Sequence, residues 1–160
     1  MKRMHVHVGV EDIPNAIEFY SALFAAQPAV VKPDYAKWML DDPRVNFAVS
    51  TRGKQPGLDH LGIQVENQDE LQEVYARLRK AGGTIIEQGH TACCYATSEK
   101  SWTDDPAGIS WETFFTTGES TQYGDGTGER EARIAHQKVC CEPQAALPSV
   151  PQTGSACCAA

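Results

Sequence analysis

An internal repeat constrains the fold of this chain more than any other feature of its 160 residues. The segment HVHVGVEDIPNAIEFYSAL, which starts at His5, aligns with HLGIQVENQDELQEVYARL, which starts at His60. In both copies, the alternation of apolar residues that is typical of a strand changes to helical spacing at the same point. Asp12 and Asn67 precede the two helical segments as N-caps would, and Gly82-Gly83 follows the second as a C-cap would.

Each predicted helix has one apolar face and is followed by three predicted strands. The apolar faces comprise Ile13, Ala16, Ile17, Tyr20, Leu23 and Phe24 in the first helix and Leu71, Val74, Tyr75 and Leu78 in the second. The strand candidates are AVVKP, AKWMLD and VNFAVST in the first half and TIIEQ, CCYATSE and SWETFFTT in the second. We therefore predict an α+β fold in which two tandem βαβββ modules, about residues 1–53 and 57–118, form one domain around a shared cleft. Residues 119–160 are rich in Gly, Pro, Ser and Thr and are predicted to be a flexible tail.

Charge and hydropathy argue against several classes of partner. The formal net charge is -7 at pH 7, and the 14 Lys and Arg residues are scattered, so the sequence offers no basic surface for nucleic acid. No apolar run approaches the roughly 20 residues that span a membrane, and the start of the chain does not resemble a signal peptide. We expect a cytoplasmic monomer or homodimer with no nucleic-acid or membrane partner.

All six cysteines occur as adjacent pairs, Cys93-Cys94, Cys140-Cys141 and Cys157-Cys158. A disulfide between neighbouring residues removes almost no chain entropy, so these pairs are not structural crosslinks. Adjacent free thiols in a reducing compartment suit the binding of a soft metal or metalloid. Successive side chains of a regular strand point to opposite faces, so Cys93 and Cys94 can bind one atom together only if a loop or bulge interrupts the strand.

Two histidines, His5 and His60, occupy equivalent positions in the repeat. A pseudo-twofold relation between the modules predicts that they face each other across the shared cleft. A single histidine on a strand is more often a packed residue than a ligand, but packing alone gives no reason for both copies to contain one. Glu112, on the last predicted strand, completes a set of two imidazoles and one carboxylate, which suits Fe(II). His7 has Gly62 as its repeat equivalent, so we expect it to be a neighbouring structural residue rather than a ligand.

The repeated unit and the motifs HVHVGVEDIPNAIEFY, DHLGIQV and DPAGISWE make residues 1–118 resemble the vicinal oxygen chelate superfamily. This superfamily includes glyoxalase I, fosfomycin-resistance proteins and extradiol dioxygenases. The resemblance implies metal ligands at His5, His60 and Glu112. Glyoxalase I adds a fourth ligand, a carboxylate on the last strand of the first half, whereas residues 45–50 of this chain include no Asp or Glu. This difference favours a three-ligand site over glyoxalase chemistry.

Within the superfamily, the segment ACCYATSEKSWTDDPAGISWE is similar to the ArsI and CadI group of non-haem iron carbon-arsenic lyases and their cadmium-induced relatives. The similarity implies an Fe(II)-dependent reaction in which O2 cleaves the C–As bond of a trivalent organoarsenical and arsenite is released. Expected substrates are methylarsonous acid and trivalent aromatic arsenicals, held by Cys93 and Cys94. Lys100, which matches the motif together with Trp102, is expected either to assist catalysis, by favouring thiolates or stabilising an anionic oxygen intermediate, or to be a surface charge.

Two other functions fit the same sequence. The first is a non-catalytic protein that sequesters cadmium or arsenic with its thiols, and the second is a glyoxalase-like thiol transferase, which would not need adjacent thiols. The pairs Cys140-Cys141 and Cys157-Cys158 lie outside the region of resemblance. They either capture arsenic(III) and relay it to the site, with tethering raising its local concentration, or belong to a dispensable tail.

Overall fold

The structure, a computed structural model, describes residues 1–52 and 55–121 of the chain. Its elements are β1 Arg3–Gly9, α1 Ile13–Phe24, β2 Val30–Lys32, β3 Tyr35–Asp41, β4 Arg44–Ser50, β5 Gly57–Val65, α2 Gln68–Lys80, β6 Ile86–Cys93, β7 Ala96–Asp104 and β8 Ser110–Glu119. A strand, a helix and three strands occur twice in succession, which confirms the predicted α+β fold with two βαβββ modules. Within the described ranges, neither helix is long and apolar enough to cross a membrane.

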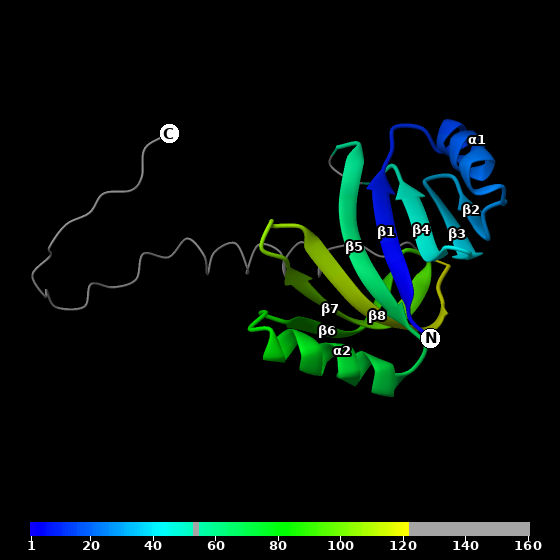
Figure 1. Cartoon of the computed structure of the whole chain (residues 1–160). Helices are drawn as coiled ribbons and strands as arrows, with labels where there is room; N and C mark the ends of the chain where they lie inside the picture. The colour runs from blue at the N-terminus through cyan, green and yellow to red at the C-terminus, as the bar shows by residue number, and fades with distance from the viewer. Residues whose placement is uncertain (53–54, 122–160) are drawn as a thin grey trace, which may run out of the picture.

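The eight strands form one curved sheet in the order β2-β3-β4-β1-β5-β8-β7-β6 (Figure 1). The modules meet in the middle of this sheet, where β1 and β5 pair antiparallel, while β1 with β4 and β5 with β8 pair parallel. Across the β1–β5 pair, His7 lies opposite His60, and His5 lies opposite Gly62. The sequence repeat matches His5 with His60 and His7 with Gly62, so a pseudo-twofold axis passes through this pair of strands.

Side-chain caps start both helices at the predicted residues. Asp12 and Asn67 each accept a hydrogen bond from the backbone N–H three residues further on, at 2.7 and 2.9 Å. The second helix ends as predicted at two glycines: the N–H of Gly83 donates to the carbonyl of Leu78, and Gly82 has a φ of 75°. Glycine adopts this left-handed conformation without strain, so both ends of α2 follow from local sequence.

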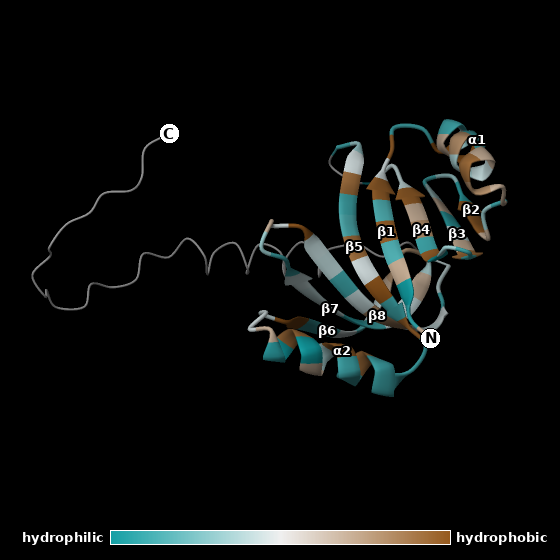
Figure 2. Cartoon of the chain, in the orientation of Figure 1, coloured by the Kyte–Doolittle hydropathy of each residue, from teal (hydrophilic) through white to brown (hydrophobic). Residues whose placement is uncertain are grey.

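Each helix packs its apolar face against its own half of the sheet, which gives the domain two hydrophobic clusters. The first comprises Ile13, Ala16, Ala36, Trp38, Leu40, Phe47 and Val49, and the second comprises Val65, Leu71, Val74 and Tyr75. The prediction for α1 is wrong at Leu23, which is 62 % exposed because it lies at the edge of the apolar face of the helix. Tyr20 and Phe24 pack against the first hydrophobic cluster instead. Figure 2 shows that α2 is largely hydrophilic on the outside, whereas α1 carries more hydrophobic residues.

The predicted strand CCYATSE is wrong, because a hairpin turn interrupts it. Strand β6 ends at Cys93, β7 begins at Ala96, and these two residues pair with each other. Cys94 and Tyr95 form the turn with φ values of 56° and 61°, the left-handed conformation that a two-residue hairpin turn of this type requires at both positions. Asn-Gly is the usual sequence for such a turn, which is why the pattern did not indicate one. The expectation that the backbone leaves strand geometry at the thiols is confirmed.

The described part of the chain ends shortly after β8. This strand runs to Glu119, one residue beyond the predicted end of the domain, and the N–H of Ser120 donates to the carbonyl of Tyr95 at 2.9 Å. The predicted flexible tail lies outside the described residues from position 122 onward.

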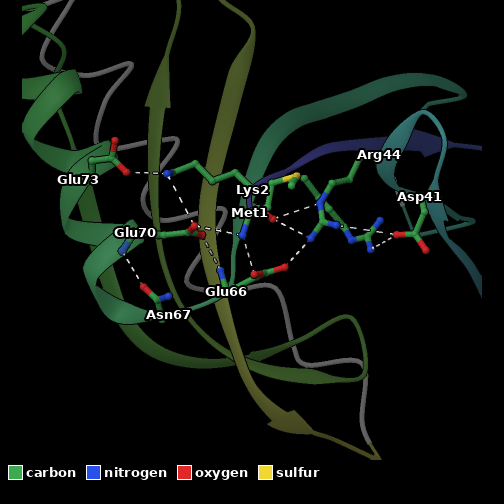
Figure 3. Close-up of polar contacts among 9 residues, drawn as sticks. Met1, Lys2, Asp41, Arg44, Glu66, Asn67, Glu70 and Glu73 are labelled. Atoms are coloured by element: carbon green, nitrogen blue, oxygen red, sulfur yellow. Dashed lines mark hydrogen bonds and ion pairs between the residues drawn. The ribbon is translucent and has the colours of Figure 1, made fainter.

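A network of charged groups joins the start of the chain to α2 (Figure 3). The Met1 ammonium group lies 2.6 Å from Glu66 Oε2, and Lys2 Nζ lies 2.6 Å from Glu73 Oε2. Arg44, at the start of β4, also forms an ion pair with Glu66. Most of these groups are exposed, so each pair adds little stability, but together they link the first module to the second.

Candidate metal and thiol site

A pocket lies on the face of the sheet opposite the helices, where both modules contribute side chains. Val8 and Ile63 pack against the helix clusters, so strand alternation points His5, His7 and His60 to the other face. The lining comprises His5, His7, Tyr35, Lys37, Asn46, Cys93, Cys94, Ala96, Ser98, Lys100, Glu112, Phe114 and Thr116. Two of the predicted metal ligands, His5 and Glu112, therefore line the same pocket as the two thiols. The third predicted ligand, His60, contacts both His5 and Glu112.

The three predicted metal ligands meet at one point. His5 Nε2 lies 3.2 Å from His60 Nε2, and Glu112 Oε2 lies 3.8 Å from the first atom and 3.6 Å from the second. All three residues are buried. Ligand atoms about 2.1 Å from a metal ion and at right angles to each other are about 3 Å apart, so small adjustments allow this triangle to hold one ion.

Hydrogen bonds fix the orientation of both imidazoles. His5 Nδ1 lies 3.0 Å from the carbonyl oxygen of Asn46, and His60 Nδ1 lies 2.6 Å from Asp59 Oδ1. Both Nδ1–H groups therefore donate, which directs the Nε2 atoms toward Glu112. Partners of this kind set the tautomer and the angle of histidines that bind metals, so the donor set fits a divalent ion such as Fe(II).

A bulge in β5 brings Asp59 beside the ring of His60. His60 pairs with His7, but the next residue of β1, Val8, pairs with Leu58. Asp59 is therefore the extra residue of the bulge. Bulges commonly redirect a side chain next to a functional site, and this one supplies the carboxylate that orients His60.

Gly62 allows the ligands to approach one another. It pairs with His5 on one side and with Glu112 on the other, so the three positions form one row across the sheet. A Cβ atom at Gly62 would lie 2.5 Å from the backbone oxygen of Glu112, which is too close for any side chain. The absence of a side chain here lets β5 and β8 come together and leaves the space between His5 and Glu112 open.

Lys100 forms a buried ion pair with Glu112. Its Nζ atom lies 3.0 Å from Glu112 Oε1 and 5.7 Å from the centre of the Trp102 ring, and the residue is only 2 % exposed. Burial alone would raise the pKa of Glu112, but Lys100 and His60 together hold it well below its ordinary value. The interpretation of Lys100 as a surface charge is therefore wrong, and Glu112 Oε2 remains directed at the two histidines.

The two imidazoles differ in their electrostatics. Burial, with a further contribution from the charge of His60, lowers the pKa of His5 to about 4. Burial also lowers the pKa of His60, but hydrogen bonds to Asp59 and Glu112 outweigh it and raise this pKa to about 9. At pH 7 His5 is neutral, and His60 carries a proton on Nε2, which faces both His5 Nε2 and Glu112 Oε2. A metal ion that binds here displaces that proton.

The turn at Cys94-Tyr95 holds the two thiols side by side. The Sγ atoms of Cys93 and Cys94 lie 2.9 Å apart, and neither cysteine is in a disulfide. Tyr95 Oη donates to Asp34 Oδ1 at 2.7 Å, so a loop of the first module anchors the turn, and Ser120 anchors it from the end of β8. Two sulfurs in this arrangement suit a single soft atom with two exchangeable positions.

Tyr35 and Lys37 line the pocket from β3, and the sequence reasoning missed both. Burial raises the pKa of Tyr35 well above its ordinary value, and negative charge on Cys94 and Cys93 adds to the effect. Burial lowers the pKa of Lys37 against the opposing influence of Cys94. Tyr35 and Lys37 alternate with the buried Ala36 and Trp38, which indicates that they point to the other face of the strand. This alternation does not indicate which residues lie against that face.

The comparison with protein families agrees with this architecture. The model of the Glyoxalase/Bleomycin resistance protein/Dioxygenase superfamily matches residues 2–113. The chain belongs to this superfamily. A solved structure with the same fold is homoprotocatechuate 2,3-dioxygenase from Arthrobacter globiformis, with a TM-score of 0.54 and 14 % sequence identity, over 76 % of this chain and 38 % of that chain.

Curated relatives within the superfamily carry two kinds of name. A "trivalent organoarsenical cleaving enzyme" of Bacillus sp. (strain MD1) is 44 % identical over 121 residues, which are 72 % of this chain and 74 % of the relative. The "cadmium-induced protein CadI" of Mycobacterium bovis (strain ATCC BAA-935 / AF2122/97) is 33 % identical over 148 residues, which are 92 % of this chain and 97 % of the relative.

All six predicted site residues of this superfamily member lie in or beside one pocket: His5, His60, Cys93, Cys94, Lys100 and Glu112. His7 lies with them, since one ring nitrogen from each of His5, His7 and His60 lies within 4.8 Å of the other two. The cysteine pairs at positions 140–141 and 157–158 lie outside the described residues.

Proposed function

We propose that this chain is an Fe(II)-dependent lyase of the dioxygenase type, which uses O2 to cleave the C–As bond of a trivalent organoarsenical and releases arsenite. For methylarsonous acid the reaction balances as CH3As(OH)2 + O2 → As(OH)3 + CH2O, so that O2 oxidises the carbon and arsenic remains trivalent. The substrate class comprises methylarsonous acid and trivalent aromatic arsenicals. The observation that carries the proposal is that one pocket combines a pair of adjacent thiols with a buried set of two imidazoles and a carboxylate. The relative named as a trivalent organoarsenical cleaving enzyme supports the same reaction.

Cys93 and Cys94 bind the arsenic atom by ligand exchange. Methylarsonous acid, CH3As(OH)2, reacts with two thiols to give a dithiolate, and the two thiol protons leave with the two hydroxyl groups as two water molecules. Only the carbon substituent remains free on arsenic. Because both sulfurs belong to one anchored turn, this substituent is held in a fixed position within the pocket, which lowers the entropy cost of the later cleavage.

His5, His60 and Glu112 would hold Fe(II) through Nε2, Nε2 and Oε2, the atoms that converge in the site. The bound metal would supply the activation of O2. The fold shields the three ligands from solvent. All three are buried, and the centre of the Trp102 ring lies 5.0 Å from the centre of the His60 ring. Exclusion of water strengthens the electrostatic interactions among the charged groups of the site.

Lys100 positions Glu112 and supplies a buried positive charge. The ion pair leaves the carboxylate one oxygen for the metal, so the orientation of Glu112 does not depend on the ion. Lys100 also lines the pocket that contains the thiols. Its charge would favour any negative charge that develops on oxygen during cleavage.

A non-catalytic sequestering protein is the second candidate, because the relative named cadmium-induced protein CadI covers nearly the whole chain. Glyoxalase-like thiol transfer has less support, since β4 provides no carboxylate ligand. We further propose that the protein is cytoplasmic and functions as a monomer or homodimer.

Anaerobic reconstitution separates cleavage from sequestration. The protein is loaded with Fe(II) under argon, mixed with methylarsonous acid and exposed to O2, and arsenite is then quantified. The lyase predicts several arsenite molecules per protein with Fe(II) and O2, and none under argon or with Zn(II) in place of iron. Tight arsenical binding without arsenite under all these conditions would establish sequestration and exclude the lyase.

A further inference from the structure

His7 is a buried histidine that the proposed reaction leaves without a role. It is 4 % exposed, and its Nε2 atom lies 2.9 Å from Ser50 Oγ. Its Nδ1 atom is also buried and has no hydrogen-bond partner. An unsatisfied buried polar atom destabilises a fold, and an apolar residue of similar size would avoid this cost.

The ring of His7 belongs to the cluster that contains His5 and His60. His7 pairs directly with His60 across β1 and β5, and their ring centres are 4.8 Å apart. One ring nitrogen of each of the three histidines lies within 4.8 Å of the other two. Two ligands on opposite sides of one ion are about 4.2 Å apart, so a small contraction brings all three nitrogens into one coordination shell.

Ser50 orients His7 in the way that Asn46 and Asp59 orient the other two histidines. Ser50 is 2 % exposed, and its Oγ lies 2.9 Å from Nε2 of His7. In the tautomer in which Nε2–H donates to this oxygen, Nδ1 keeps its lone pair. In each of the three rings, one nitrogen is thus engaged by a fixed oxygen and the other is available for a metal. The arrangement of His7 is that of a ligand rather than that of a packed residue.

We propose that His7 is a fourth protein ligand of the metal, through Nδ1, beside His5, His60 and Glu112. The inference rests on the proposed metal site and goes beyond the three-ligand set. A fourth ligand leaves the ion fewer positions for exogenous molecules. Such a centre suits a substrate that is held by Cys93 and Cys94, because the ion then has to accept only O2.

Metal binding without catalysis tests this assignment. Co(II) is titrated into the anaerobic full-length protein, and both affinity and the visible d–d spectrum are recorded for wild type, His7→Phe, Ser50→Ala, His60→Phe and His90→Phe. His90 lies exposed on β6 and is the matched control. We expect His7→Phe to weaken Co(II) binding at least tenfold and to change the spectrum, Ser50→Ala to cause a smaller loss, and His90→Phe to match wild type.

A second measurement on wild type keeps the test valid if His7→Phe does not fold. Long-range ¹H–¹⁵N correlation spectra of the histidine rings, recorded before and after Zn(II) addition, count the coordinated rings. Three shifted rings, with Nδ1 as the shifted atom of His7, support the proposal. The His7 assignment alone is overturned if only two rings shift. It is also overturned if His7→Phe binds Co(II) within twofold of wild type while His60→Phe loses Co(II) binding. Unchanged binding by both His7→Phe and His60→Phe overturns the metal centre of the proposed function as well.

Discussion

His5 Nε2 lies 3.2 Å from His60 Nε2, although the two residues are 55 positions apart in the sequence. The contact arises where the two modules join, because β1 and β5 are neighbours in the sheet. Glu112 reaches the same point from β8, across a row in which the middle position is a glycine. The geometry of the proposed centre therefore depends on the close approach of three strands.

Gly62→Ala tests this dependence. The added methyl group would lie 2.5 Å from the backbone oxygen of Glu112, so β5 and β8 must separate. We expect a loss of about 1–3 kcal/mol in the free energy of unfolding, measured in urea, together with weaker Co(II) binding. Gly118→Ala is the matched control, because its methyl group meets only the rotatable hydroxyl group of Thr97. Equal effects of the two substitutions would contradict the argument.

Removal of Lys100 leaves Glu112 with a buried charge that has lost its closest partner. For Lys100→Met in the metal-free protein we expect the free energy of unfolding to fall by about 3–5 kcal/mol. Glu112→Gln in the same chain removes the charge and should restore more than half of this loss. Urea unfolding of both single variants and the double variant gives the coupling energy. Additive losses would show that the two side chains do not form the ion pair that the structure contains.

Much of this fold can be predicted from sequence because its determinants are local. Apolar periodicity, the caps Asp12 and Asn67, and the glycines after α2 each act within a few residues. The repeat then supplies the relation between the modules, and with it the facing positions of His5 and His60.

The features that sequence did not predict depend on contacts between distant elements. The turn at Cys94-Tyr95 has no glycine, and its anchors are Asp34 and Ser120, far away in the chain. The pairing of Lys100 with Glu112 requires the register of β7 against β8, and nothing in the local pattern reveals it. The exposure of Leu23 likewise depends on how α1 sits on the sheet.

If Cys93 and Cys94 form the proposed clamp, both thiols at the turn should be required for arsenical capture. In a chain with Ser at Cys140, Cys141, Cys157 and Cys158, we expect phenylarsine oxide to bind with a stoichiometry of one and to protect both remaining thiols from alkylation. Cys93→Ser and Cys94→Ser should each lower the affinity at least a hundredfold, because one sulfur cannot form the dithiolate. Thr91→Ser, a conservative change on β6, should bind as the parent does. Retention of tight binding by either single-cysteine chain would rule out the two-sulfur clamp.

Truncation of the chain after Thr121 tests the tail-relay hypothesis. The cut must lie beyond Gly118, because Glu119 belongs to β8 and Ser120 anchors the thiol turn. If the tail cysteines relay arsenic(III), the truncated chain should match the full chain in stability and at saturating arsenical, but should turn over more slowly at low substrate. Turnover equal to that of the full chain at every concentration would eliminate the relay.

A single-turnover experiment tests most directly whether the metal ligands and the thiol pair act together in cleavage of the C–As bond. Full-length protein is loaded under argon with one equivalent each of Fe(II) and methylarsonous acid, O2 is admitted, and arsenic species are separated after acid quenching. The proposed lyase should give close to one arsenite per protein, and none when Glu112→Ala or Cys94→Ser replaces wild type. Methylarsonous acid recovered intact from the oxygenated, iron-loaded wild-type protein would contradict it.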